Sequence, residues 1–540
     1  MNMKKLILNL VVLLPLTLLG QVKLSQDFKV STSTPFMVVD AASKEYIGVA
    51  NGNTVSVKTH GERVIVQLFG INGMKELQRN EYEDFPKYAK IQTLLKVGER
   101  LYYVFEAFNK KEKTFTVYSR EIDVAKGSFK EIKTLFTTKG DVVSSGYKIS
   151  ASSFFGIGQL PKFDVISSFD GSKILIQYRN RPESKNDSKN YDELGFYVFD
   201  NTFTKIWGKE VKMPHTEKEM NNIAYTINKD GNVFMLARIN ESKSFELITV
   251  SDKEGLKNKI LPVKKGLAFD KFDLRESSNG NIIAGGYYAN GTDTKVDWTG
   301  TMSFSRNING IYVFEFSKDG NLVRDNDYPF SIELIKQNLS LRQKDKAETR
   351  EEAGTAGIND LVLRNFVLNS DGSIVVIGET NYTKKEWWMT SLEMVTHFGD
   401  IVATKIDVNG KLVWAQKMAK NQAVLQSNIQ DMGGLGISYI QGKGAHYILF
   451  VDNRKNAALK MDQPAEPHKG GFGGYLTAYK IDDATGKIDK HSILDLTNIK
   501  GIKAYQFNVT RIFEAIDKTF MLEVYKKDKE DIMVKMELTK

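Results

Sequence analysis

Histidine and cysteine are the residue types that most often carry acid–base, nucleophilic or metal chemistry at neutral pH. The chain of 540 residues contains no cysteine and six histidines, none of them paired at the spacing of a zinc-binding HExxH helix. It also contains no GxSxG segment that would present a catalytic serine. The histidines stand singly at His60, His215, His397, His446, His468 and His491. These residues therefore predict neither a catalytic site nor a metal site.

Several glycine-containing stretches are candidates for ligand-binding loops. "FGIGQL", "QGKGAH" and "GGFGG" lack the strand–helix context of a phosphate-binding loop. "SFDGSK" and "NKDGNV" lack the series of carboxylates that a calcium loop needs, so we interpret them as hairpin turns. The sequence consequently predicts no bound cofactor.

Large aromatic side chains in polar segments are stronger candidates for binding, because a buried aromatic ring covers roughly 150–250 Å². Trp387 and Trp388 are adjacent in "YTKKEWWMTSLEMVTHF", Trp298 lies in "DTKVDWTGTMSF", and Phe154 and Phe155 lie in "SASSFFGIGQLP". Two readings remain open: the rings pack on one another as a lid, or they form a platform for a protein partner or a glycan. Two other tryptophans, Trp207 and Trp414, lie in fourth strands and are expected to pack within the blades.

The segments that carry these aromatic residues interrupt a structural unit that recurs along the chain. A roughly alternating apolar run, a turn glycine and a β-rich run that ends in asparagine recur along the chain, which predicts a repeated hairpin. A third strand and a more polar fourth strand follow each hairpin. The turn glycines are Gly98, Gly171, Gly231, Gly280, Gly372 and Gly444. Recurrence of whole units predicts internal structural repeats.

Four antiparallel strands per unit, with the apolar strands central, predict an all-β protein, a β-propeller. Residues 46–79 look like a further complete unit, and the last unit, 505–540, supplies only three strands. The segment 22–30 is expected to add the fourth strand and close the ring. This gives eight blades in a single domain over 21–540, with seven blades as the alternative if one of these units is irregular.

Long insertions follow second strands or separate blades, while the remaining turns stay short. In an up-and-down blade these two kinds of connection emerge on the same side, so we predict one face rich in loops. Binding surfaces of repeat scaffolds usually gather on one face. The insertions are 139–162, 181–193, 291–309, 331–360, 382–399, 419–434 and 454–474, of which 331–352 is expected to be helical.

The first twenty residues predict export. Lys4 and Lys5 precede the apolar run "LILNLVVLLPLTLL", which ends in "GQ", so we expect a signal peptide over 1–20 that is cleaved after Gly20. The run is short for a membrane span, and no later stretch predicts a transmembrane segment. Removing two lysines changes the net charge from +9 to 9 − 2 = +7. No concentrated basic stripe is present, and nucleic-acid binding is not predicted.

The chain resembles secreted bacterial β-propellers whose blades carry an Asp-Gly or Asn-Gly turn between the first two strands, over most of residues 40–540. The "LGQ" end of the signal and the strands rich in lysine, asparagine and tyrosine are similar to exported flavobacterial proteins. The resemblance implies a periplasmic or secreted protein. The chain ends in the strand-like "MVKMELTK", which favours retention in the periplasm over display on the cell surface.

Two functional hypotheses follow. The first is a non-catalytic interaction protein, a rigid disc that presents its loop face to a protein partner. Its setting suggests an accessory subunit of an outer-membrane assembly such as a type IX secretion translocon. The alternative is a secreted glycan-binding protein or hydrolase with a site at the central channel. Its acids would be those of the loops: Asp141, Asp297, Glu386 and Asp462.

Overall fold

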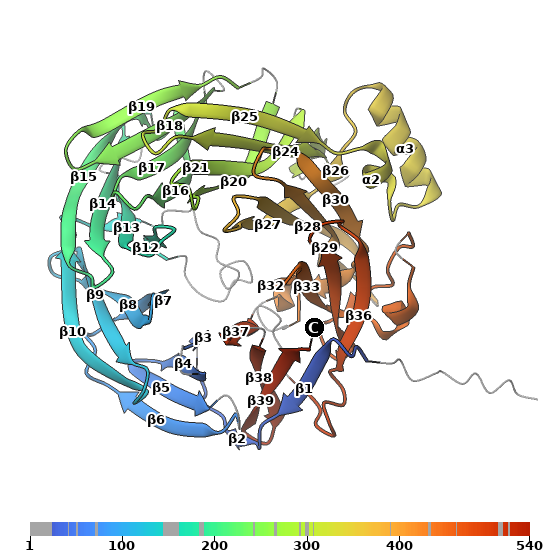
Figure 1. The fold of residues 1–540 in the computed structure, drawn as a ribbon, viewed down its shortest axis with the longest axis horizontal. Coiled ribbons are helices and arrows are strands. Elements are labelled where there is room, and N and C mark those ends of the chain that lie inside the picture. Colours follow the sequence, from blue (N-terminus) through green and yellow to red (C-terminus); the bar gives the residue numbers. More distant parts are fainter. Residues whose placement is uncertain are drawn as a thin grey trace, which may run out of the picture.

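The protein is a ring of eight four-stranded antiparallel sheets around a central channel (Figure 1), as a computed structural model shows. The structure describes residues 24–41, 43–49, 52–70, 74–143, 161–182, 188–240, 244–263, 267–290, 293–296, 302–305, 307–388, 390–429, 434–460, 462–505, 511–516 and 519–539. Strands account for 63% of this part of the chain and helices for 6%. The predicted β-propeller with eight blades is therefore confirmed.

The first strand of each blade lines the channel and the fourth lies outermost (Figure 1). Blade 1 contains β3 (Ser43–Gly48), β4 (Asn53–His60), β5 (Arg63–Gly70) and β6 (Glu76–Tyr82). Blade 2 contains β7 (Lys90–Val97), β8 (Arg100–Asn109), β9 (Thr114–Asp123) and β10 (Ser128–Thr137). Blade 3 contains β12 (Phe163–Ser167), β13 (Lys173–Asn180), β14 (Tyr191–Asp200) and β15 (Lys205–Thr216), with β11 (Val142–Val143) beside β13. Blade 4 contains β16 (Met220–Ile227), β17 (Val233–Ile239), β18 (Ser244–Ser251) and β19 (Gly255–Leu261).

Most of the strands beyond the four of each blade belong to the second half of the ring. Blade 5 contains β20 (Leu267–Glu276), β21 (Ile282–Asn290), β24 (Asn307–Phe316) and β25 (Leu322–Pro329), with β26 (Ile358–Asn359) beside β24 and a separate hairpin of β22 (Asp293–Val296) and β23 (Met302–Ser305). Blade 6 contains β27 (Leu361–Leu368), β28 (Ile374–Trp388), β29 (Ser391–Ile406) and β30 (Leu412–Met418), with β31 (Gln422–Leu425) and β34 (His468–Lys469) added. Blade 7 contains β32 (Ser438–Gly442), β33 (Ala445–Asp452), β35 (Tyr475–Asp482) and β36 (Ile488–Asp495). Blade 8 contains β37 (Phe513–Ile516), β38 (Thr519–Lys527), β39 (Glu530–Leu538) and β1 (Phe28–Thr32), with β2 (Phe36–Met37) beside β39.

The turn between the first two strands of blade 4 explains why the Asp-Gly pattern recurs. The side-chain oxygen of Asn228 accepts hydrogen bonds from the N–H groups of Asp230 and Asn232, at 3.1 and 2.9 Å. Gly231 between them has φ of 82°, a conformation that glycine adopts without a Cβ clash. The hydrogen bonds to the side chain of Asn228 and the positive φ of Gly231 thus let the chain reverse direction within a few residues.

Central strands are apolar on both faces because neighbouring blades cover both sides of each sheet. Every residue of β33 is buried, and all but one residue of β17. The outermost strand β19 instead exposes Lys257 and Lys259. Lysines on an outer strand discourage pairing with another sheet edge.

Trp207 and Trp414 link adjacent blades, and their predicted burial is confirmed. Both indole rings are 6% exposed. Trp207 donates its Nε1–H to the carbonyl of Gly231 in the next blade, at 3.1 Å, and Trp414 donates to that of Asp483, at 3.0 Å. Each ring therefore packs at a blade junction and has its polar group satisfied.

The segment expected to be helical forms two helices on the outer side of the ring (Figure 1): α2 (Ile332–Lys336) and α3 (Leu341–Glu352). Leu334 and Ile335 of α2 are buried against blades 5 and 6. Asn338, with φ of 63°, separates the two helices. No helix of the described residues is long and apolar enough to cross a membrane.

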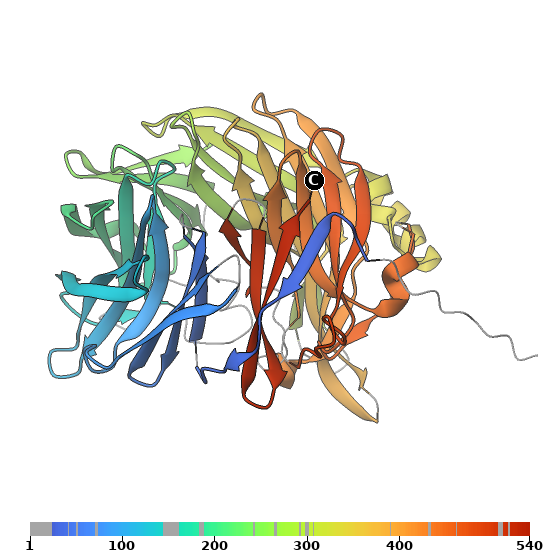
Figure 2. The same cartoon turned by 60° about the horizontal axis from the view of Figure 1, so that its bottom comes forward.

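The two ends of the chain meet in blade 8 (Figure 2). β1 pairs antiparallel with β39, from Phe28 opposite Leu538 to Thr32 opposite Val534. The strand expected over 22–30 thus begins at Phe28 in the part of the chain that is described. Phe28 is 6% exposed and its ring contacts Tyr447 of blade 7 edge-on, with 5.5 Å between centroids. Closure therefore combines backbone hydrogen bonds with burial of an aromatic ring.

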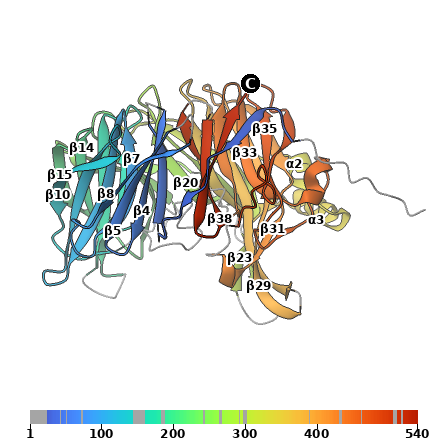
Figure 3. The same cartoon turned by 90° about the horizontal axis from the view of Figure 1, so that it is seen from below.

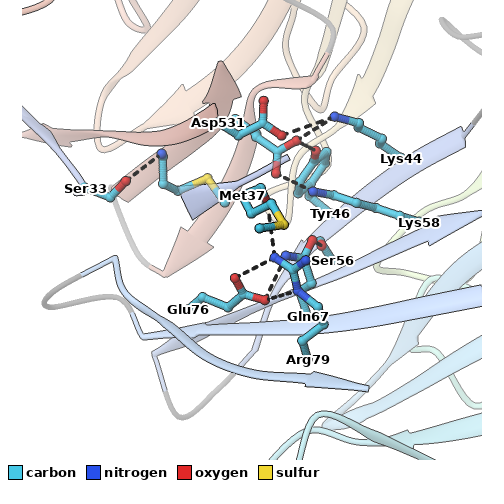
Figure 4. Close-up of polar contacts among 12 residues, drawn as sticks. Ser33, Met37, Lys44, Tyr46, Ser56, Lys58, Gln67, Glu76, Arg79 and Asp531 are labelled. Atoms are coloured by element: carbon cyan, nitrogen blue, oxygen red, sulfur yellow. Dashed lines mark hydrogen bonds and ion pairs between the residues drawn. The ribbon is translucent and has the colours of Figure 1, made fainter. Parts of the chain in front are cut away.

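A buried cluster of charges joins blade 8 to blade 1 (Figure 4). The Glu523 carboxylate accepts hydrogen bonds from Lys58 at 2.6 Å, Lys44 at 2.9 Å and the Tyr46 hydroxyl at 2.8 Å. Lys58 is fully buried and Glu523 is 6% exposed. The second carboxylate, Asp531, lies 3.5 Å from Lys44 through Oδ2, while its Oδ1 is buried without a hydrogen-bond partner.

The two carboxylates consequently have opposite pKa shifts. Burial alone raises the pKa of Glu523, but Lys58 and Lys44 outweigh it and hold the pKa at about 2. Burial, reinforced by the negative charge of Glu523, raises the pKa of Asp531 to about 7. The more completely hydrogen-bonded carboxylate is thus ionised at neutral pH, and the less satisfied one keeps its proton until the pH approaches about 7.

Replacing Phe28 by alanine should loosen ring closure. We expect the Phe28→Ala variant to lose about 3 kcal/mol of unfolding free energy, because a buried ring is removed and the cavity relaxes only partly. Denaturant unfolding measures this. Met37→Ala is the matched control, since Met37 lies in the same N-terminal segment but is 71% exposed. Equal stabilities of the two variants would show that β1 does not hold the ring closed.

The Asp531 carboxyl should make stability fall as the pH rises. The folded protein binds this proton more tightly than the unfolded chain, so its contribution is complete below the ordinary pKa of 3.8 and is lost as the pH rises through about 7. An amide cannot ionise, so Asp531→Asn should escape this loss. Between pH 4 and 8 we expect its unfolding free energy to rise by about 4 kcal/mol relative to that of the wild type. Parallel pH profiles of the two proteins would refute the assignment.

Candidate interaction face

The longest projection of the ring lies on the side away from the end of β39. Figure 3 shows the β28–β29 hairpin extending beyond the blades, with β23 on the same side. Both hairpins connect a second strand to a third strand, and these connections share one side of an up-and-down blade. The described parts of two predicted insertions, 291–309 and 382–399, thus project on one face, which we call the loop face; the helices of insertion 331–360 lie on the outer side of the ring instead.

The β28–β29 hairpin is an extension of two blade strands. Residues 382–399, expected to be a loop inserted after a strand, instead continue β28 to Trp388 and begin β29 at Ser391. The partner strand β27 pairs with β28 only as far as Thr380, and β30 pairs with β29 only from Ile401. Beyond the blade, the two strands form a ribbon that only β31 joins, opposite residues 395–398.

One face of this ribbon exposes apolar side chains. Trp387 lies opposite Leu392, and Lys385 opposite Met394, in the strand register. Residues two apart on a strand share a face, so Trp387, Leu392 and Met394 lie together. Their exposed fractions are 73%, 38% and 43%. Three large apolar side chains on one projecting face form a contiguous exposed apolar surface. We call Trp387, Leu392 and Met394 the apolar stripe.

The opposite face of the ribbon is packed and polar. The Tyr382 ring stacks on His397 with 4.8 Å between centroids, and Glu386 Oε1 lies 3.2 Å from His397 Nε2. Trp388 is half-buried, and the ammonium of Lys469 in β34 lies 5.3 Å from its ring centroid. This face therefore anchors the hairpin to the blade.

The histidine on this packed face is unsuited to positive charge. Burial lowers the pKa of His397, although the nearby Glu386 raises it. Lys384, 2.8 Å from Glu386, supplies the cationic neighbour of that carboxylate. The Glu386 carboxylate thus lies between Lys384 and His397, and these contacts support the shape of the hairpin.

The structure separates the residues singled out from sequence. Trp387 is exposed, and adjacent Trp388 points to the opposite, packed face of the ribbon. Trp298, Phe154 and Phe155 lie outside the described residues. Leu392 and Met394 were missed, although their spacing relative to Trp387 fits a hairpin with a two-residue turn. The sequence between Trp388 and Ser391 is Met-Thr, which is not the Asn-Gly or Asp-Gly pair that signals such a turn.

The loop acids of the alternative hypothesis do not form a common group among the described residues. Asp141 lies 3.8 Å from Lys162 and accepts hydrogen bonds from Arg181, whereas Glu386 belongs to the projecting hairpin. Asp462 is exposed after β33, and Asp297 lies outside the described residues. Within the described part of the chain, no three histidine or acidic side chains are grouped to hold a metal ion.

Comparison with known proteins supports no family assignment. No family model and no curated protein matches the sequence. The chain is similar in structure to the WD40 domain of SCAP from fission yeast, with 7% identity, a TM-score of 0.36, and 96% of this chain and 97% of that chain covered. It is similar to the polysaccharide lyase Uly1, with 10% identity, a TM-score of 0.32 and coverages of 83% and 89%. It is also similar to an uncharacterized protein from Listeria monocytogenes, with 10% identity, a TM-score of 0.37 and coverages of 81% and 91%. Similarities this distant carry no information about activity.

Proposed function

We propose that the protein is a non-catalytic interaction disc that binds a protein partner through its loop face. The observation that carries this proposal is Trp387, which is 73% exposed on a hairpin that projects beyond the ring. Tryptophan is the residue type most enriched among the few that dominate binding energy at protein interfaces. Leu392 and Met394 extend the same apolar surface beside it.

The hairpin is built to hold such a surface in place. Its strands continue from the centre of blade 6, where Ile374 to Ile377 are buried, and its packed face is tied by the contacts among Tyr382, His397 and Glu386. A rigid anchor loses little conformational freedom when it binds, so more of its contact energy appears as affinity.

The proposed setting is the periplasm. The basic and apolar start of the sequence supports export, and the likeness to exported flavobacterial proteins supports an outer-membrane assembly, such as a type IX secretion translocon, as the partner. In this setting the disc is an accessory subunit whose loop face docks on that assembly. The proposal needs no cofactor and no metal.

Replacing Trp387 by alanine should weaken partner capture while leaving the fold intact. Loss of an interface anchor costs about 2 kcal/mol or more, so we expect at least tenfold weaker capture from native envelope extract. The melting temperature should change little because the ring is exposed. Trp388→Ala is avoided as the main variant, because the half-buried Trp388 contributes to the hairpin itself.

Ile260→Ala is the matched control, because Ile260 is 71% exposed but lies on β19, an outer strand of blade 4. It should capture the partner as wild type does. Treating the envelope extract with protease before capture should abolish binding if the partner is a protein. Capture that survives protease, or that Trp387→Ala leaves unchanged, would contradict the proposed function.

A further inference from the structure

The β28–β29 ribbon has an unpaired edge. Beyond Thr380, no strand of the described residues pairs with β28 on the side away from β29. The open stretch runs from residue 382 to residue 388, which spans about 23 Å at the usual rise of a strand. An unpaired edge presents backbone N–H and C=O groups as a template for another strand.

Asn381 shows which backbone groups of β28 point outward, away from β29. Its N–H points away from β29, because it donates to the carbonyl of Asp360 at 2.9 Å. Backbone groups of an antiparallel pair alternate between inward and outward directions, so those of Thr383 and Trp387 also point outward. Neither Thr383 nor Trp387 donates its N–H to another described strand on this side.

The open edge borders the apolar stripe. Trp387 belongs both to the edge, through its outward backbone groups, and to the exposed face with Leu392 and Met394. A strand added beside β28 would place every second side chain over this face. Backbone hydrogen bonds would then supply affinity and the apolar contacts would supply selectivity.

We propose that an extended segment of the protein partner binds by adding a strand to the open edge of β28, an inference that rests on the proposed function. The segment alternates apolar side chains, which cover the side of Trp387, with acidic side chains. The acids lie on the opposite side of the added strand, near Lys384, whereas Lys385 lies on the side of Trp387. A second copy of this chain fits poorly, because two such edges paired antiparallel along their length would set lysines opposite lysines.

The experiment uses a library of octapeptides displayed on phage, in which β-branched residues alternate with aspartate, glutamate, serine or threonine. The library is panned against the full chain, and the selected peptide is labelled for fluorescence anisotropy. We expect binding to the wild type, at least tenfold weaker binding to Thr383→Pro, and unchanged binding to Thr383→Ala. Proline removes the outward N–H, whereas alanine removes the Thr383–Thr396 side-chain hydrogen bond and keeps the N–H.

Hydrogen–deuterium exchange provides a readout that needs no variant. The outward amides of Thr383 and Trp387 should exchange at least tenfold more slowly when the peptide is bound. Absence of any peptide that binds below 1 mM, or equal affinity for Thr383→Pro and wild type, would overturn strand addition. A dimer of the chain that Thr383→Pro dissociates would assign the edge to a second copy instead.

Failure of this inference can be separated from failure of the proposed function. If Trp387→Ala weakens partner capture while Thr383→Pro does not, the partner binds the apolar stripe by side-chain contact, and only strand addition is wrong. If Trp387→Ala leaves capture unchanged, the hairpin is not the binding site and both proposals fail.

Discussion

Closure of the ring is the constraint on which the rest of this structure depends. The apolar central strands of each blade are covered on both faces only because the blade has a neighbour on each side. The pairing of β1 with β39 gives blade 8 its fourth strand and joins the two ends of the chain. Without that strand, β39 would keep an open edge and Phe28 would leave its place against blade 7.

The charges between blades 1 and 8 make this junction specific. Removing Lys58 or Glu523 from water costs several kcal/mol, and their hydrogen bonds offset that cost only when the two blades meet in the correct register. A misplaced closure would leave buried charges unpaired, which is more costly than a misplaced apolar contact. The cluster therefore discriminates between correct and incorrect closure more than it adds to stability.

A closed ring also tolerates additions at one side. Because backbone groups inside the blades are already paired, β28 and β29 continue past the ring without disturbing their neighbours. The outer strands carry lysines where an edge faces solvent, as Lys257 and Lys259 of β19 do. The extended edge of β28 likewise carries Lys384 and Lys385, yet it ends in the exposed ring of Trp387. This combination is what the proposed addition of a partner strand requires, since lysines oppose pairing between two copies of the edge.

The sequence by itself determined the four-stranded repeat and predicted eight blades, with seven as the alternative, because these depend on local patterns. Left-handed glycines such as Gly231, alternating apolar residues and loop lengths act over a few residues. Only the tertiary structure decided which tryptophan is available. Trp388 is half-buried beside Lys469, which is distant in sequence, while Trp387 next to it faces outward. The contact of Lys58 with Glu523 likewise joins residues at opposite ends of the chain, and no local pattern specifies such a pair.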